Sequence, residues 1–190
     1  MKTPLAAIIL GTTLLLSGCA SMLSDGQPVQ QSPGHRTLGS YVDDELIETK
    51  ALINLSAGSE ELKAANVSVV SYNGIVLLTG QVPSEYTKQE AEQIVSEVRK
   101  VRRIHNELTI SGTSSALART NDTWLTTKVK TQLLANEAID GGRIKVVTDG
   151  GTVYLMGLVS HAEADTAVQI VRGISGVQKI IKIFEYIDQP

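Results

Sequence analysis

Residues 67–80 have the sequence VSVVSYNGIVLLTG, in which Asn73-Gly74 separates two runs of apolar and β-branched residues. Such runs are typical of β-strands. Asn and Gly both tolerate the positive φ angles that a two-residue turn between antiparallel strands requires. The segment therefore predicts a β-hairpin with strands near 67–72 and 75–82.

The hairpin pattern occurs twice, so the body of the chain is an internal repeat. The second copy predicts strands near 143–148 and 152–159, joined by Gly150-Gly151 in place of Asn73-Gly74. The offset between matching residues falls from 78 to 76 along the copy, which two single-residue insertions or deletions in the connections explain.

A predicted amphipathic helix, near 41–56 and 121–135, precedes each hairpin. Apolar residues recur at every fourth position: Ile47, Ala51 and Leu55, then Leu125, Val129 and Leu133. We interpret Asn121-Asp122 as an N-cap of the second of these helices. The acidic run Asp43-Asp44-Glu45 is expected to complement the N-terminus of the first.

Each copy continues with a second helix, near 84–99 and 160–173, and a last strand, near 104–110 and 179–187. The order αββαβ predicts the α+β class: two tandem domains, each a small three-stranded mixed sheet packed with two helices on one face. Because so small a sheet leaves its edges open, we expect the copies to cover each other's edges or helices.

The predicted divisions of the chain follow from this repeat and from composition. They are a signal peptide (1–18), a lipidated N-terminus with a flexible linker (19–40), a first domain (41–111), a linker (112–119) and a second domain (120–190).

The N-terminal segment has Lys2 at its head and an apolar run from Leu5 to Leu16, which is typical of a signal peptide. Leu16-Ser17-Gly18-Cys19 resembles the bacterial lipobox, in which the cysteine receives acyl chains, palmitate among them, and becomes the new N-terminus. The alternative is an ordinary secretory signal that contains a cysteine. The lipobox, with Ala20 after the cysteine, implies an outer-membrane anchor that faces the periplasm.

Both copies contain a sequence pattern that resembles a known domain family. The pattern of Val-x-Val, x-x-Gly-x-Val-x-Leu-x-Gly, a helix and Gly-Val resembles the BON domain. Residues 67–80 carry it in the first copy, and residues 146–157 with Gly176-Val177 carry it in the second. The first copy lacks the closing glycine, because Lys100 stands before Val101.

The resemblance implies a protein that binds rather than catalyses. BON domains are thought to bind phospholipid, and lipoproteins with two of them are associated with anionic lipid, cell-division sites and envelope integrity. The helix that opens the second copy is the membrane-contact element that the family implies. An anionic phospholipid surface is thus the expected partner, and enrichment at the division septum is expected by analogy alone.

The residues of that helix support the same site. Trp124 is the only tryptophan of the chain and lies one helical step away from the inward stripe, with Lys128 one turn later. A tryptophan beside lysines suits the headgroup region of a bilayer. The predicted lipid-binding residues are Thr120, Asp122, Thr123, Trp124, Thr127, Lys128, Lys130 and Thr131. The alternative is that Trp124 is buried between the two domains.

Charge differs between the copies. Residues 43–111 contain 11 acidic and 7 basic residues, and residues 119–187 contain 7 and 8. An anionic surface is therefore expected to repel the first copy and to attract the second. The basic run at Arg99-Lys100 and Arg102-Arg103 suits a helix C-terminus and solvent, with a partner site or an anionic glycan as the alternative.

Several function classes are disfavoured by the sequence. No Ser/His/Asp arrangement, carboxylate pair or second cysteine indicates an enzyme. His35, His105 and His161 have no metal-ligand spacing, so no cofactor or metal is expected. The pI of about 5.6 argues against nucleic acid. A monomer is expected, and the alternative function is a periplasmic adaptor for envelope, cell-wall or division proteins.

Overall fold

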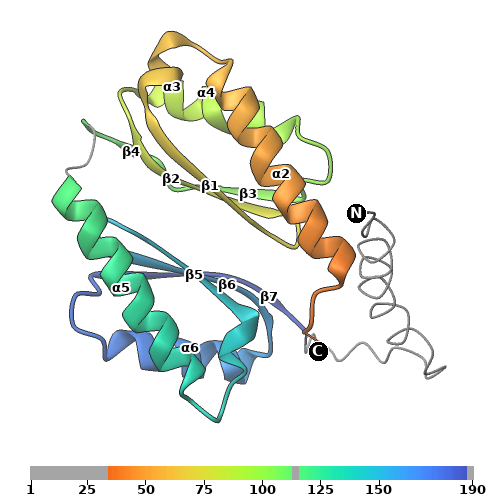
Figure 1. The fold of residues 1–190 in the computed structure, drawn as a ribbon, viewed down its shortest axis with the longest axis vertical. Helices are drawn as coiled ribbons and strands as arrows, with labels where there is room; N and C mark the ends of the chain where they lie inside the picture. The colour runs from red at the N-terminus through yellow and green to blue at the C-terminus, as the bar shows by residue number, and fades with distance from the viewer. Residues whose placement is uncertain (1–33, 113–115, 188–190) are drawn as a thin grey trace, which may run out of the picture. The chain divides into compact units, whose positions relative to one another are not determined.

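The computed structural model describes residues 34–112 and 116–187, with backbone only for 116–118. The predicted signal peptide 1–18, Cys19, most of the linker 19–40 and residues 113–115 of the linker 112–119 lie outside this description. Both repeats belong to one unit of the chain, residues 32–190. Figure 1 shows a sheet with helices on its outer side in each repeat.

The first repeat has the predicted αββαβ order with one extra short helix. Strands β1 and β2 are antiparallel, and β3 and β4 both pair in parallel with β2. The elements are α2 (Leu38–Ser56), α3 (Glu60–Ala64), β1 (Asn66–Tyr72), β2 (Ile75–Val82), α4 (Glu85–Ser96), β3 (Arg103–Asn106) and β4 (Thr109–Ile110). The single predicted last strand is divided because Leu108 turns into the core, where it is 2% exposed.

The second repeat has the same order and the strand order β5-β6-β7. Strand β6 is antiparallel to β5 and parallel to β7. The elements are α5 (Ala116–Leu134), a 3-10 turn η2 (Gly141–Arg143), β5 (Ile144–Asp149), β6 (Thr152–Val159), α6 (His161–Arg172) and β7 (Lys179–Tyr186). The predicted α+β class with two tandem αββαβ repeats is therefore confirmed.

The two opening helices begin earlier than predicted. Thr37 is the N-cap of α2, and its side chain accepts a hydrogen bond from the Ser40 N–H at 3.1 Å. Helix α5 begins at Ala116, inside the predicted linker. The predictions that Asn121-Asp122 caps α5 and that Asp43-Asp44-Glu45 lies at the start of α2 are wrong, because both segments lie inside their helices.

A buried carboxylate instead joins each opening helix to its hairpin turn. Asp44 accepts the backbone N–H groups of Asn73 at 2.8 Å and Gly74 at 2.9 Å. Asp122 accepts those of Gly150 and Gly151, both at 2.9 Å. All four turn residues have φ between 52° and 76°, as the predicted turns require. The repeated aspartate therefore fixes the helix against the turn.

Each repeat has its own core between its sheet and its helices. In the first repeat this core is formed by Ile47, Ala51 and Leu55 of α2 with residues of β1, β2 and α4. Leu125, Val129 and Leu133 of α5 have the same role in the second repeat. The predicted inward stripes of both helices are thus confirmed.

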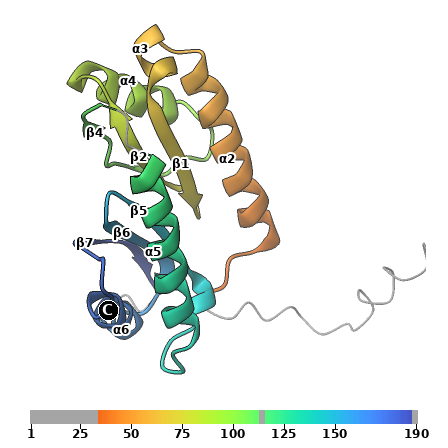
Figure 2. The ribbon, with the colours of Figure 1, turned by 60° about the vertical axis from the view of Figure 1, so that its left-hand side comes forward.

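A third apolar cluster lies between the two sheets. It consists of Tyr72, Ile75, Leu77, Tyr154, Met156 and Ile183. The repeats therefore cover each other's sheet faces, and the expectation that they cover edges or helices is wrong. The physical reason is that the strands are apolar on both faces, so each sheet needs a second cover besides its helices. Figures 1 and 2 show the helices on the outer sides as a result.

Polar contacts frame this interface between the sheets. The Tyr72 hydroxyl donates to the Arg143 carbonyl at 2.7 Å, and the Gly80 N–H donates to Asp149 at 3.1 Å. Arg102 pairs with Glu185 at 2.7 Å, and that hydrogen bond raises the pKa of Arg102. Each of these bonds thus joins the two repeats at the edge of the apolar contact.

We expect Asp122→Ala to lower the free energy of unfolding by about 2–3 kcal/mol, because two turn N–H groups lose a charged acceptor. Urea unfolding followed by circular dichroism measures the change. Asn121→Ala, at the exposed neighbouring position, should change the same free energy by less than about 0.5 kcal/mol. Equal stability of the two variants would contradict the role given to the carboxylate.

Burial between the sheets, together with the carboxylates of Glu107 and Asp149, raises the pKa of Tyr154 from 10.0 to about 12. The unfolded chain loses this proton near pH 10, so the stability that the neutral phenol contributes is complete below pH 10 and is lost as the pH rises towards 12. We expect Tyr154→Phe to make the free energy of unfolding fall less steeply across this window. Parallel pH profiles of the variant and the wild type would show that the phenol is not held neutral.

Candidate functional site

The outer face of α5 carries the tryptophan that the sequence analysis singled out. Trp124 is 56% exposed, on the side of the helix opposite the buried Leu125, Val129 and Leu133. Leu134 lies on the same outer half of the helix near its C-terminus and is 58% exposed. The helix therefore presents two large apolar side chains to solvent.

Threonines occupy most of the surface between these two side chains. Thr123, Thr127 and Thr131 are exposed, and each hydroxyl donates to the carbonyl four residues earlier, at 2.9–3.0 Å. Since the hydroxyl protons are used within the helix, the outer surface presents threonine methyl groups and oxygen lone pairs. Thr120 is also exposed on this face.

Cations flank the outer face on both sides. The Lys128 ammonium lies 4.8 Å from the centroid of the Trp124 ring, a cation–π distance. Lys130 and Arg119 are exposed on the other flank. None of the three forms an ion pair with a carboxylate of the residues that the structure describes.

Helix α5 contains only one carboxylate, Asp122, and it is 8% exposed. Both of its oxygens accept N–H groups of the hairpin turn. The exposed face of α5 therefore has three cations and no acidic group. Such a face combines apolar surface with positive charge, which suits the boundary between a bilayer's headgroups and its acyl chains.

The structure thus brings together most of the residues predicted to bind lipid. Seven of them lie on the outward sides of α5, where six are exposed and Lys128 is half-buried: Thr120, Thr123, Trp124, Thr127, Lys128, Lys130 and Thr131. Asp122 does not, because its carboxylate holds the turn, and we leave it out of the site. Sequence reasoning missed Leu134, which lies on the outer half of the helix, and Arg119, which lies on the flank with Lys130.

The alternative that Trp124 is buried between the repeats is contradicted by its exposure. Its counterpart Leu46 is likewise 48% exposed. The apolar cluster between the repeats is made by residues of the two sheets and includes neither Trp124 nor Leu46.

The three histidines lie at separate places in the fold. Within residues 34–112 and 116–187, no group of three or more His, Cys, Asp and Glu side chains is arranged to hold a metal ion. His161 stacks on Tyr186 with 3.9 Å between the ring centroids. His35 lies 3.6 Å from Asp140, and burial lowers the pKa of His105. No helix in the described segments has both the length and the apolar character needed to span a bilayer.

Comparison with known proteins identifies the repeat. The BON domain matches residues 43–112 and again residues 121–187. The chain belongs to the BON domain family. The residues outside both matches are the N-terminal segment, the short connection between the repeats and the last three residues.

Several curated proteins share this organisation over most of their length. The chain is 37% identical to the outer membrane lipoprotein DolP of Haemophilus influenzae, over 96% of this chain and 95% of that protein. It is 36% identical to the 21 kDa hemolysin of Actinobacillus pleuropneumoniae, over 80% and 78% of the two chains. It is 27% identical to osmotically-inducible protein Y of Escherichia coli, over 94% and 92%. The first of these relatives supports an envelope location for a BON protein of this length.

Proposed function

We propose that this chain is an outer-membrane lipoprotein that binds anionic phospholipid through the outer face of α5. The observation that carries the proposal is the exposure of Trp124 on a helix face that has cations on both flanks and no exposed carboxylate. An indole exposed to water gains by transfer to the headgroup region, where its apolar body and its N–H group are both accommodated.

The charges on α5 favour an anionic surface over a neutral one. Each Lys or Arg close to such a surface contributes about 1 kcal/mol of attraction. Lys128 lies over the indole, so its ammonium would meet a phosphate at the depth at which Trp124 meets the headgroups. Arg119 and Lys130 would make the same contact from the opposite flank.

Attachment and recognition are separate tasks in this proposal. Acyl chains on Cys19 would hold the protein at the periplasmic face of the outer membrane, since each buried methylene contributes about 0.8 kcal/mol. The name of the Haemophilus relative supports this location. Contact through α5 would then select a lipid composition within the membrane, which is consistent with roles in envelope integrity and at division sites.

The proposed role is binding without catalysis. The Haemophilus influenzae relative is named as an outer membrane lipoprotein, and the BON domain accounts for both repeats of this chain. The exposed groups of α5 are an indole, ammonium and guanidinium groups, methyl groups and hydroxyls whose protons are used within the helix. This set provides attraction for a surface rather than an acid, a base and a nucleophile.

The test uses protein that begins at Ala20, which keeps every contact described above. Flotation with vesicles that contain phosphatidylglycerol is expected to recover the wild type. Trp124→Glu should weaken this recovery about tenfold, because it places a negative charge at the point of contact. The matched control is Tyr86→Glu, which changes an aromatic side chain that is 70% exposed on α4.

Circular dichroism and thermal unfolding of Trp124→Glu should match the wild type, because the side chain makes no core contact. Undiminished flotation of this variant would overturn contact through α5. Failure of the wild type to float with either anionic or neutral vesicles would favour the adaptor alternative.

A further inference from the structure

The outer face of α2 carries an apolar stripe that nothing in the described residues covers. Leu38, Val42, Leu46 and Ile53 are between 48% and 85% exposed, and we call them the α2 stripe. They lie on the side of the helix opposite the buried Ile47, Ala51 and Leu55. At 1.5 Å per residue the stripe is about 22 Å long, which is more than a small ligand covers.

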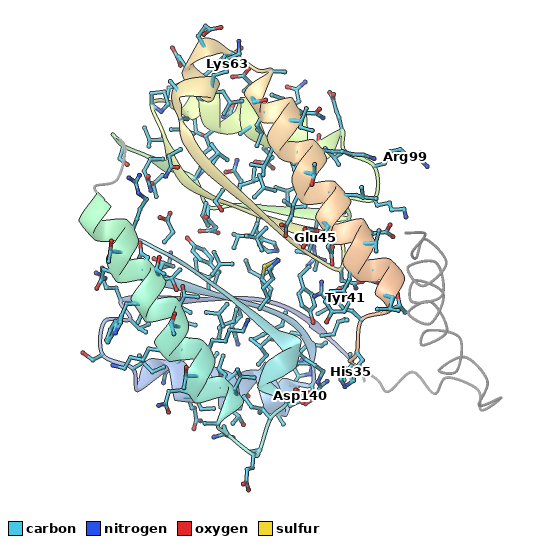
Figure 3. All side chains as sticks on the ribbon, viewed as in Figure 1. His35, Tyr41, Glu45, Lys63, Arg99 and Asp140 are labelled. Carbon is cyan, nitrogen blue, oxygen red and sulfur yellow. The ribbon has the colours of Figure 1, made fainter. Side chains whose placement is uncertain are left out.

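Cations gather beside the middle of this stripe. Lys50, Arg99 and Lys100 line a hollow of about 240 Å³ together with Leu46 and Asp43. The Lys100 ammonium pairs with Asp43 at 2.6 Å, whereas Lys50 and Arg99 have no ion-pair partner in the described part of the chain. Figure 3 shows Arg99 projecting outwards beside α2. The hollow thus has an excess of two positive charges.

Lys100 has an unfavourable backbone conformation. Its φ is +74°, a left-handed conformation that is unfavourable for a residue with a Cβ. The corresponding residue of the second repeat is Gly176, with φ +103°, for which that region carries no penalty. The first repeat therefore has a lysine where the backbone favours glycine, and the side chain it gains points a cation into the hollow.

The α2 stripe and the outer face of α5 occupy equivalent positions in the two repeats. Leu46 corresponds to Trp124, and Lys50 corresponds to Lys128, both at an offset of 78 residues. Each opening helix therefore exposes a large apolar side chain with a lysine one turn later. In the first repeat Arg99 and Lys100 add positive charge at the position where the second repeat has Ser175 and Gly176.

We propose that the α2 stripe, with Lys50, Arg99 and Lys100, is a second membrane-contact surface for lipid with anionic phosphate headgroups. The stripe supplies the apolar contact and the hollow supplies charge complementary to phosphate. The stripe also begins at Leu38, directly after the segment that leads from Cys19, so an anchored chain holds this helix close to the bilayer. The surface shares the membrane with the proposed function but does not depend on contact through α5.

The net negative charge of the first repeat does not oppose this surface. Asp43 is paired with Lys100, Asp44 is buried at the turn, and Glu48 bonds to Lys145 and to the Ser71 N–H. On this side of α2, Glu45 is the exposed carboxylate without an ion pair among the described residues. The acidic residues of the first repeat that would repel an anionic lipid surface therefore lie mainly on its other faces.

The test uses chain from Ala20 onwards and vesicles of phosphatidylglycerol in phosphatidylcholine. Leu46→Glu and Lys100→Gly should each weaken binding about fivefold, and Glu45→Gln should strengthen it. Lys182→Ala, which removes the same charge from β7, is the control and should leave binding within twofold. Lys100→Gly should unfold at the same or a higher temperature than the wild type, because it relieves the left-handed lysine, so weaker binding by this variant cannot be attributed to unfolding.

Repeating both substitutions in a Trp124→Glu background separates the two surfaces. Losses in both backgrounds support the second contact, even where Trp124→Glu alone has no effect and the proposed function fails. Binding unchanged by Leu46→Glu and Lys100→Gly overturns the inference. Equal losses on pure phosphatidylcholine, or full competition by inorganic phosphate at constant ionic strength, also overturn it, since neither fits a charged lipid surface.

Discussion

The packing of the two sheets against each other determines how the rest of the molecule is exposed. Tyr72, Leu77 and Met156 lie in an apolar layer that uses the sheet faces left open by the helices. Once those faces are joined, the helices of each repeat can only lie outside. The outer sides of α2 and α5 thereby remain open to partners, and both proposals concern these two helices.

The buried aspartates link this arrangement to the hairpins. Asp44 and Asp122 each accept two consecutive turn N–H groups, so the turn of each hairpin is attached to its opening helix. This geometry also explains why the outer face of α5 has positive charges and no exposed carboxylate. Its one carboxylate is withdrawn from the surface, and the outward side keeps only Arg119, Lys128 and Lys130 as charged groups.

Much of this fold follows from local sequence. The turns at Asn73-Gly74 and Gly150-Gly151 and the apolar period of α2 and α5 are properties of neighbouring residues, and these predictions are confirmed. The start of α5 was missed because Ala116–Arg119 stands within a Ser/Thr-rich segment typical of a loop, although Ala, Leu and Arg favour helix. The role of Asp122 was missed because its partners are 28 and 29 residues away. The sheet packing did have a signal in the sequence, since Ile75–Leu78 is a continuous apolar run instead of an alternating one. In the fold all eight residues of β2 are buried, which one covering layer of helices does not explain.

The segment just before α2 contacts both repeats, which matters for a chain that is pulled from its N-terminal side. Arg36 pairs with Asp44 at 2.6 Å and stacks on the rings of Tyr41 and Tyr72, while His35 lies beside Asp140 of the second repeat. The chain therefore leaves the fold at a seam that involves both repeats. A pull on the N-terminal segment would act first on the Arg36–Asp44 pair within the first repeat and on the His35–Asp140 contact with the second. In the proposed lipoprotein, a tether at Cys19 would therefore load contacts of both repeats before it reaches α2.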